Sequence, residues 1–451
     1  MEALFDDRLL RCLLENAPVC DIALERFLTA VRDILLESAS NAERDPLAAA
    51  SLTFHCALAR QCFINDFVFA HTADEFARAS ILRDRLVAAL QSGAPAPASW
   101  LPAVGTYFPL FALPIADDLR RRTWPDVVEA LLVQQVSEPL EERALRQEIP
   151  RLTVVSDPVS RQVQQQYEEN PYPRWIKVPP PGEALSLDAY VRQHFPLSPF
   201  RGVDGGDKVD ILVAGCGTGR EPIELARQFA GAQVLAVDMS LSSLGYALRK
   251  TRELGLSNVD YAQGDLTRLG AIGRSFDLVS AVGVLHHLMD PMAGWRELLS
   301  LLRGGGLMLV GLYSEHARQS IAAARKLIAE RGYAADVASI RRCRQDLMAL
   351  EDGMPLKEVS SFNDFYVTSE CRDLLFHVQE HCLTLPDLKA QLKELGLSFL
   401  GFFLERNVLD HYAARFPEDR SKTDLDCWNE FEKSFPKTFA GMYVFLVQKS
   451  A

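Results

Sequence analysis

The chain has 451 residues, more than one hydrophobic core usually supports, so we expect two or three domains. Its formal net charge of −12 argues against a nucleic-acid partner, because phosphate repulsion would require a dedicated basic patch. No apolar run is long enough to cross a membrane, and the acidic start with Glu2, Asp6 and Asp7 differs from a secretory signal. The nine cysteines lack metal-type spacing and are typical of reduced thiols, so we expect a cytoplasmic protein without a membrane partner.

The first part of the chain, 1–150, is expected to form a helical N-terminal domain. Its apolar residues recur at the three- and four-residue spacing of amphipathic helices. Segments with this spacing are 27–36, 52–69 and 76–90. A further helix is predicted from Pro125, after Thr123, to near Val136. The charged segment 138–146 is expected to connect this domain to the rest.

The next segment, 151–200, is expected to be a linker that also caps the site of the following domain. Pro171 and Pro173 flank a tyrosine, and the residue before each proline is pushed out of the helical region. The aromatic residues nearby either line an acceptor channel or only dock the linker, and both interpretations fit the sequence. The candidate capping residues are Tyr167, Tyr172, Arg174 and Trp175. A short helix is predicted at 187–194.

The segment 210–220 predicts a buried strand that breaks into a glycine-rich loop. Its near-continuous apolar run is typical of a parallel strand covered on both faces. Glycines allow a sharp turn and a close approach of the backbone to a ligand, and Pro222 suits the first turn of a following helix. We therefore expect a nucleotide-like cofactor at this loop. Its residues are Gly215, Cys216, Gly217, Thr218 and Gly219.

Two further predicted strands end in acids. The second strand, 233–238, ends in Asp238, about twenty residues after the glycines, where a carboxylate can bind ribose hydroxyls. The third, 261–266, closes on Asp265 and Leu266. An NAD-dependent oxidoreductase shares these features, but the third glycine falls one residue early for the dinucleotide pattern.

The fourth and fifth predicted strands complete this series. The fourth, 275–282, runs into Gly283 and Val284. A helix around 295–302 leads to the fifth strand, 307–312. Five landmarks in this order and spacing are far more specific than a glycine loop alone.

Together these elements resemble the core of a class I S-adenosylmethionine-dependent methyltransferase over about 209–312, within a predicted core domain of 201–312. The resemblance implies an α/β fold: a Rossmann-like, doubly wound sheet of seven strands with the last strand antiparallel. It also implies S-adenosyl-L-methionine as the cofactor. A helical N-terminal domain and a helical insertion after the fifth strand, 313–384, are expected in addition.

The resemblance also assigns roles to residues at matching positions. The glycine loop would hold the methionine end of the cofactor, and Asp238 would bind the ribose, with the neighbouring Met239 as a further cofactor-binding residue. Asp265 and Leu266 would lie at the adenine. Gly283 and Val284, at the end of the fourth strand, would face the methyl group.

Two positions depart from the family pattern. The family usually has Asp or Glu two residues before the first glycine, where this chain has Val213, so that role passes to another residue such as Glu221 or is dropped. Gly304 replaces the usual proline in the turn before the fifth strand, with little functional weight.

The last part of the chain, 385–451, is expected to complete the sheet. A helix at 385–395 precedes a sixth strand at 398–404, and a last, antiparallel strand is predicted at 442–447. Between these strands, aromatic residues are spaced for one helical face, which favours core packing over a substrate wall. These residues are Trp428, Phe431, Phe435 and Phe439.

Three residues are candidates for catalysis at the acceptor side. His286 and His287 follow the fourth strand, and an imidazole there could accept a proton or could instead only fix the loop. Tyr313, at the end of the fifth strand, could contact a cationic acceptor or pack against the loop. The segment 377–381 matches the H-x-x-E-H pattern of zinc peptidases, which on a helix places both histidines on one face. We expect a hydrogen-bonding pair that faces the acceptor pocket rather than a metal site.

The sequence therefore predicts a methyltransferase whose favoured acceptor is a protein side chain, lysine first. The large helical flanks support this choice, and the chain is loosely similar to bacterial methyltransferases with helical N-terminal modules, some of which modify protein lysines. A small-molecule methyltransferase, with the flanks serving a homodimer, is the first alternative. A binding or scaffold protein with a degenerate methyltransferase core is the second, motivated by Val213.

Overall fold

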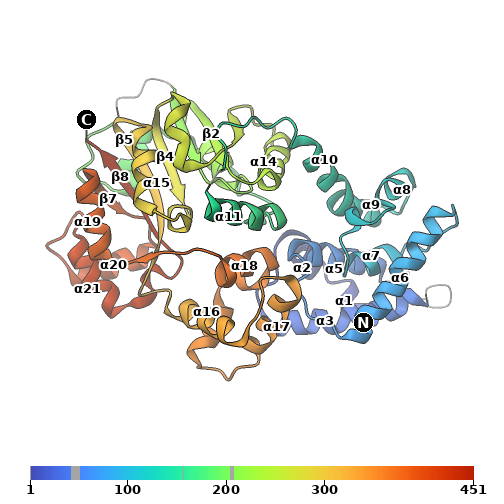
Figure 1. Ribbon diagram of the computed structural model, residues 1–451. Helices are drawn as coiled ribbons and strands as arrows, with labels where there is room; N and C mark the ends of the chain where they lie inside the picture. The colour runs from blue at the N-terminus through green and yellow to red at the C-terminus, as the bar shows by residue number, and fades with distance from the viewer. Residues whose placement is uncertain (1, 42–50, 156, 204–207, 451) are drawn as a thin grey trace. The chain divides into compact units, whose positions relative to one another are not determined.

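The computed structural model describes residues 2–41, 51–155, 157–203 and 208–450, and Figure 1 labels its elements. Residues 42–50, within the predicted N-terminal domain, and 204–207, within the predicted core, lie outside the described ranges. None of the described helices combines the length and the apolar content that a membrane crossing requires.

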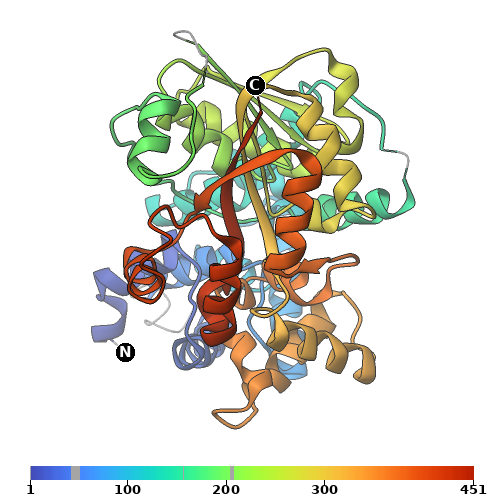
Figure 2. The ribbon, with the colours of Figure 1, turned by 90° about the vertical axis from the view of Figure 1, so that its left-hand side faces the viewer.

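A mixed sheet is formed by strands that lie between Val209 and Lys449. Its strands follow the order β3-β2-β1-β4-β5-β8-β7, and β6 pairs with β5 outside this path. The first five of these are mutually parallel, whereas β8 runs antiparallel to both β5 and β7. In Figure 2 the red β8 runs beside the yellow β5. The strands are β1 (Val209–Ala214), β2 (Ala232–Asp238), β3 (Val259–Gln263), β4 (Phe276–Val282), β5 (Leu302–Ser314), β6 (Cys382–Leu383), β7 (Leu397–Phe402) and β8 (Tyr443–Lys449).

The predicted fold class is confirmed. Successive residues of each strand bury their side chains on opposite faces of the sheet. In β1, Leu212 and Ala214 belong to one core cluster, whereas Ile211 and Val213 belong to another. Helices cover both faces, as a doubly wound sheet requires. The first cluster includes side chains of α15 (Pro291–Ser300), α19 (Leu385–Leu395) and α21 (Leu425–Ser434). The second includes side chains of α12 (Leu187–His194), α13 (Arg220–Gln228) and α14 (Leu241–Glu253).

Several boundaries differ from the sequence predictions. The third strand ends at Gln263, so Asp265 lies beyond it and caps a 3-10 helix, Leu266–Ile272. The short β6 was missed because two residues give no periodic pattern. The single helical face predicted for four aromatic residues is wrong in part, because α21 ends at Ser434 and Phe439 lies on a separate 3-10 helix.

The core packing predicted for those aromatic rings holds for three of them. Trp428, Phe431 and Phe439 are fully buried in the first core cluster, and the Tyr412 ring stacks on Trp428 with ring centroids 3.7 Å apart. Phe435 is 36% exposed and lies outside the cluster.

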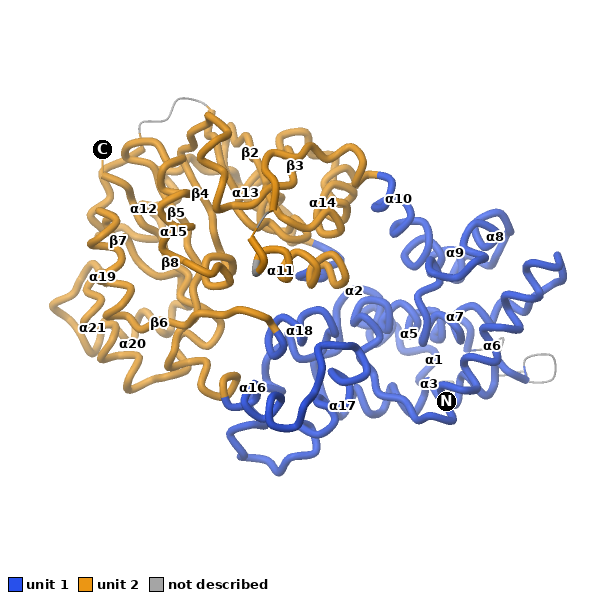
Figure 3. The backbone as a smooth tube through the Cα atoms, viewed as in Figure 1, with its two compact units in different colours: residues 1–144, 172–177, 323–376 blue, residues 145–171, 178–322, 377–451 orange. Residues whose placement is uncertain are grey.

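The chain divides into two compact units, which Figure 3 colours differently. We call Met1–Ala144, Tyr172–Lys177 and Ala323–Phe376 the helical unit. The sheet unit comprises Leu145–Pro171, Val178–Ala322 and His377–Ala451. The predicted insertion 313–384 is thus shared, since its middle belongs to the helical unit and its two ends to the sheet unit.

The predicted N-terminal helices are present in the helical unit. The segments 27–36 and 76–90 lie within longer helices, and a capping box at Thr72 and Glu75 begins α6. The predicted helix 52–69 ends earlier, at Ile64. The helices of this unit are α1 (Glu2–Phe5), α2 (Arg8–Asn16), α3 (Ile22–Ser40), α5 (Leu52–Ile64), α6 (Ala73–Gln91), α7 (Trp100–Gly105), α8 (Ala116–Arg121), α9 (Asp126–Leu132), α17 (Val337–Met348) and α18 (Thr368–Phe376), with most of α10 (Glu138–Leu145) and α16 (Gln319–Arg331).

The predicted end of a helix near Val136 is wrong, whereas the charged segment after it does contain the junction between the two units, at Ala144 and Leu145. A π-helical turn at Val133–Ser137 joins α9 directly to α10. This wider turn accommodates the buried Gln135, whose Nε2 donates to the carbonyl oxygens of Ala59, at 2.9 Å, and Gly105, at 3.0 Å. The helix therefore continues to Leu145.

Candidate functional site

The glycine loop has a backbone that disfavours other residues. Gly215, Gly217 and Gly219 all have positive φ angles, of 74°, 51° and 83°. A Cβ on Gly219 would lie 2.5 Å from the Ala247 Cβ, and one on Gly215 would lie 2.4 Å from a methyl of Val284. The loop backbone is thus packed tightly against Ala247 and Val284. Its amides lie before the N-terminus of α13, where anionic or polar ligand groups are stabilised.

Asp238 links this loop to the end of β2. Its Oδ2 accepts a hydrogen bond from the Gly217 amide and its Oδ1 from the Ser240 amide, both at 2.8 Å. Burial raises the pKa of Asp238, and these two amide donors partly offset that effect. The carboxylate retains further lone pairs, which are the acceptors that a pair of ribose hydroxyls needs.

The next predicted residues continue the same edge of the sheet. Asp265 is buried, its Oδ1 accepts from both the amide and the hydroxyl of Thr267, and its amide donates to Thr153 at 2.6 Å. The Met239 carbonyl accepts from Gln263 Nε2 at 2.9 Å. The conformation of both residues is therefore fixed by hydrogen bonds within the sheet unit.

All predicted cofactor residues follow the carboxyl ends of β1 to β4. Gly283, with φ of 75°, ends β4, and the neighbouring Val284 packs against the glycine loop. The adjacent strands β1 and β4 form the point where the strand order reverses, and open α/β sheets bind ligands at this point. Cys216, Thr218 and Leu266 are buried beneath this edge.

Glu221, the residue suggested for the role of the acid missing from β1, lies in the first turn of α13. Val213 is buried beside Ser280 of β4, and the Ser280 hydroxyl donates to a carboxylate oxygen of Glu221. Burial raises the pKa of Glu221 to about 7. A cationic group placed beside it would restore its charge, which is the property expected of the acid that the family carries on β1.

The four predicted capping residues are divided between the two units. Tyr167 lies on α11 (Pro158–Glu169) of the sheet unit, whereas the other three belong to the helical unit. There, Arg174 Nε lies 2.9 Å from Asp66 Oδ1, its guanidinium covers the Phe63 ring, and Trp175 is buried. The capping role of Tyr167, Tyr172, Arg174 and Trp175 stays a prediction.

A row of aromatic rings lies at the ends of β4 and β5, and it includes all three candidate catalytic residues. The ring centroids of Tyr167 and His377 are 6.0 Å apart, and those of His377 and His287 are stacked at 3.7 Å. The row continues from His287 to His286 at 4.2 Å and from His286 to Tyr313 at 4.0 Å. We call these five residues the aromatic row.

Hydrogen bonds order the histidines of this row. His287 Nδ1 lies 2.8 Å from the Gln379 carbonyl oxygen and therefore donates to it, while the Nε2 atoms of His286 and His287 are 3.1 Å apart. Burial lowers the pKa of His286 well below its usual range, and the neighbouring histidines and Arg318 add to this effect. His286 is therefore neutral near pH 7.

A buried ion pair closes the row and was missed in the sequence. Arg318 makes two hydrogen bonds of 2.9 Å to Glu380, and each side chain is 5% exposed. The Arg318 guanidinium lies 3.5 Å from the Tyr313 ring centroid, so it supports that ring. The H-x-x-E-H motif includes Glu380 but does not predict its pairing with Arg318.

The helix predicted for that motif is wrong. Residues 377–381 form an irregular stretch between α18 and β6, because the His381 amide donates to the His286 carbonyl at 2.8 Å instead of continuing a helix. His377 and His381 do not bond to each other, since the Gln379 amide donates to His377 Nδ1 and the Gln379 side chain contacts His381 Nε2.

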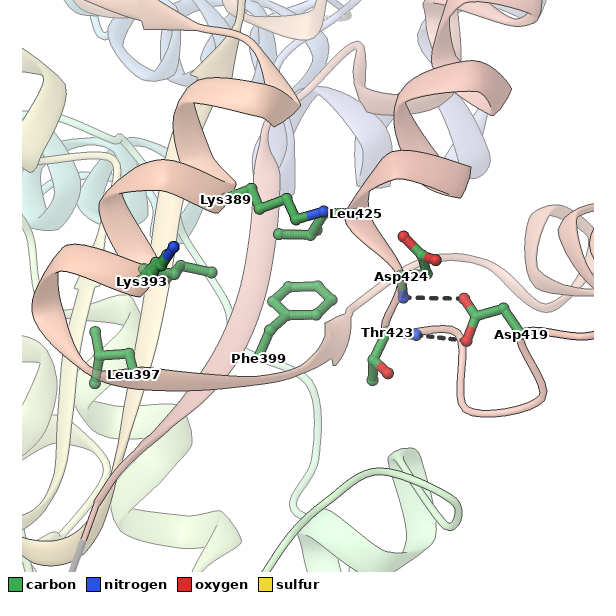
Figure 4. A pocket seen from close by; sticks show the side chains of 9 residues that line it. Lys389, Lys393, Leu397, Phe399, Asp419, Thr423, Asp424 and Leu425 are labelled. Atoms are coloured by element: carbon green, nitrogen blue, oxygen red, sulfur yellow. Dashed lines mark hydrogen bonds between the residues drawn. The ribbon is translucent and has the colours of Figure 1, made fainter.

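An open pocket of about 480 Å³ lies elsewhere, on α19, β7 and the start of α21 (Figure 4). Phe399 lies at its centre, and Asp419 accepts from the backbone amides of Thr423 and Asp424 at 3.2 and 3.0 Å. Its Lys389 is paired with Asp426. None of the predicted cofactor or catalytic residues lines this pocket.

Comparisons with known proteins agree with the geometry. Residues 211–306 match a family described as "Methyltransferase domain". An uncharacterized protein of Synechococcus sp. is 31% identical over 199 residues, which cover 43% of this chain and 48% of the relative. The ubiquinone biosynthesis O-methyltransferase of Parvibaculum lavamentivorans is 33% identical over 126 residues, 27% of this chain and 48% of the relative. The chain thus spans about half the length of these curated relatives.

Solved structures show a weaker likeness. PKMT2 from Rickettsia typhi is 14% identical, with a TM-score of 0.45, over 60% of this chain and 54% of its own. A S-adenosylmethionine-dependent methyltransferase from Clostridium acetobutylicum is 28% identical, with a TM-score of 0.23, over 25% of this chain and 45% of its own.

The sheet topology, the glycine loop and the acids after β2 and β3 coincide with the matched segment. Residues 211–306 therefore belong to a class I methyltransferase domain, whose cofactor is S-adenosyl-L-methionine.

Proposed function

We propose that the protein is an S-adenosylmethionine-dependent methyltransferase whose acceptor is a side chain of a protein or peptide, lysine first. The aromatic row is the observation that carries this proposal. It follows β4 and β5 at the same edge of the sheet as the cofactor residues, and four of its five rings are buried there. Aromatic faces attract cationic groups such as an ammonium.

The row also suits the chemistry that an amine requires. The cofactor supplies a methyl group already bound to a positively charged sulfur, so the protein mainly aligns the acceptor. A lysine must arrive neutral, and a desolvated aromatic surface lowers its pKa. The imidazoles of His286 and His287, whose Nε2 atoms lie 3.1 Å apart, are the candidate proton acceptors within the row. Tyr313, supported by Arg318, positions the acceptor.

The composition of the helical unit supports a large acceptor. This unit combines the N-terminal residues with Ala323–Phe376, which are inserted between β5 and β6. The segment that follows β5 therefore belongs to the helical unit. Recognition of a small metabolite would not require a unit of this size.

A small-molecule acceptor with a hydroxyl or carboxylate is the second candidate. It is favoured by the named relatives, which include the ubiquinone biosynthesis O-methyltransferase and the trans-aconitate 2-methyltransferase of Deinococcus radiodurans, 34% identical over 110 residues.

Incubating the protein with methyl-labelled cofactor and cell lysate distinguishes the candidates. We expect label in the protein fraction, and methylated lysine after acid hydrolysis, with Asp238→Ala as the inactive control. Label confined to small molecules would overturn the protein acceptor. Calorimetry that detects no binding of S-adenosylhomocysteine would instead favour a degenerate scaffold.

A further inference from the structure

The C-terminal turns of α11 are bonded to the loop that follows Asp238. Gln164 Nε2 donates to the Met239 carbonyl at 2.9 Å, and the Ser240 hydroxyl donates to the Tyr167 carbonyl at 3.0 Å. These contacts lie within the sheet unit. The helix is thus attached to the segment that presents the predicted ribose-binding carboxylate.

Glu168 makes the closest of these contacts. Its Oε1 accepts from the Leu241 amide at 2.6 Å, and its Oε2 accepts from the Ser242 amide at 3.0 Å and the Ser242 hydroxyl at 2.6 Å. Leu241 is the first residue of α14, and Ser240 is the N-cap of that helix. Glu168 therefore satisfies two N-terminal amides that no residue of α14 can reach, and its charge suits the helix dipole.

These bonds lead to the cofactor site in two steps. The N-terminal turn of α14 follows Ser240, the Ser240 amide donates to Asp238 Oδ1, and Asp238 Oδ2 accepts from Gly217 of the glycine loop. Whatever fixes the start of α14 also fixes the direction in which Asp238 points.

We propose that Glu168 is a positioning residue for the cofactor, which orients Asp238 toward the ribose by holding the N-terminal turn of α14. This inference rests on the proposed binding of S-adenosylmethionine at this edge of the sheet. It gives α11 a role in cofactor affinity through Glu168, a residue that the sequence pattern did not single out. The residue acts through Asp238 and does not contact the reacting atoms.

Two physical effects of Glu168 oppose each other, which makes the sign of a substitution informative. Its hydrogen bonds fix the loop, whereas its negative charge near Asp238 disfavours the ionised form of that acid. If the charge effect dominated, Glu168→Gln would tighten cofactor binding. The positioning role predicts weaker binding.

The experiment measures calorimetric affinities of the full chain for S-adenosylhomocysteine and for its 2′-deoxy analogue. We expect Glu168→Gln to weaken binding of S-adenosylhomocysteine about tenfold, as losing a residue that orients a ligand-binding group typically does. The wild-type preference for the ribose over the deoxyribose ligand should shrink as well. A merely structural defect would weaken both ligands by the same factor.

Two further variants keep the inference testable. Glu169→Gln makes the same charge change at the exposed neighbouring position and should leave both affinities unchanged. Ser242→Ala removes one donor to Glu168 and should reproduce part of the loss, less than additively with Glu168→Gln. Unchanged or tighter binding in Glu168→Gln, or an equal loss for both ligands, would overturn the positioning role. If Glu168→Gln does not fold, Ser242→Ala decides by the same criterion. Failure of the wild-type protein to bind either ligand would overturn the proposed function instead.

Discussion

The sheet unit and the helical unit are stabilised in different ways. In the sheet unit, the conformation of the predicted cofactor residues is fixed by backbone amides, by positive φ angles and by acids at or just after the ends of strands. In the helical unit, buried charges join residues far apart in sequence: Arg344 pairs with Glu25 at 2.8 Å, with side-chain exposures of 0% and 3%. The first arrangement depends on backbone geometry and the second on buried charge pairs, so they should respond differently to substitution.

Arg344 is the centre of the second arrangement. Both its terminal nitrogens contact Glu25, its Nε donates to the Phe365 carbonyl at 2.6 Å, and it also contacts the Val68 carbonyl. A second buried pair, Arg32 with Glu75, is completed by the Tyr107 hydroxyl. Removing one partner of such a pair leaves a charge without compensation in the core.

The largest expected effect is therefore in the helical unit. Arg344→Ala should lower the free energy of unfolding by about 3–5 kcal/mol, the cost of leaving a buried partner charge. Arg331→Ala, which breaks the half-exposed pair with Asp346, is the control and should leave the free energy of unfolding almost unchanged. Urea unfolding measures both. Equal losses in the two variants would contradict the contrast, and replacing Glu25 and Arg344 together by Leu and Met should recover part of the stability.

The next effect tests how closely the glycine loop is packed. Gly219→Ala combines a positive φ with severe crowding against Ala247, whereas Gly255→Ala has a positive φ of 67° and open space around it. We expect about 1 kcal/mol of destabilisation for Gly255→Ala and about 2–3 kcal/mol for Gly219→Ala, where overpacking adds to the backbone strain. Only Gly219→Ala should also weaken cofactor binding. Similar thermal shifts for the two variants would show that the loop tolerates a side chain.

A somewhat smaller effect is expected for the acid after β2. Asp238→Asn keeps the shape of the side chain but removes its charge and one acceptor, so affinity for S-adenosylhomocysteine should fall about 10- to 100-fold, the range for a lost hydrogen bond to a charged group. The exposed Asp260 on β3 provides the control, Asp260→Asn, with no expected change. Stability should change little in either variant, which melting temperatures would verify. Unchanged affinity in Asp238→Asn would remove Asp238 from the site.

The most gradual effect is the dependence of stability on pH, and its sign differs between the units. In the helical unit, burial lowers the pKa of His55 to about 3, so the unfolded chain binds the proton first and stability falls as pH falls from 6.5 toward 3. In the sheet unit, burial raises the pKa of Glu221 to about 7, so the folded state holds the proton and stability falls as pH rises from 4.5 to 7. Each group contributes about 1.4 kcal/mol per pH unit within its window.

Melting temperatures across pH check both signs. His55→Leu should flatten the acid side of the profile, and Glu221→Gln should flatten the side between pH 4.5 and 7. A profile that Glu221→Gln leaves unchanged would show that this carboxyl is not the buried acid described above.

The same contrast explains what could be read from the sequence. The strands, the glycine loop, Asp238 and Asp265 follow from local patterns, because each glycine or acid directly follows a buried strand. The contacts of Glu168 with α14, by contrast, join separate helices, and no spacing rule predicts them. The helix predicted at 377–381 failed because contacts with His286 override the local pattern.

Other features were missed for the same reason. The π-helical turn Val133–Ser137 depends on the buried Gln135, whose partners lie on other helices. The Arg318–Glu380 pair joins the two ends of the inserted segment, so neither residue marks it alone. Such contacts are formed only after the chain has folded.

The pairing of β5 with β6 has an evolutionary consequence. Tyr313 and Ser314 lie beside Cys382 and Leu383, so the long stretch between them departs from the sheet and comes back to it at nearly one place. An inserted segment of this kind can be lengthened, shortened or replaced without changing the order of the strands in the sheet. A lineage of such proteins could therefore change what it modifies while leaving the nucleoside end of the site intact.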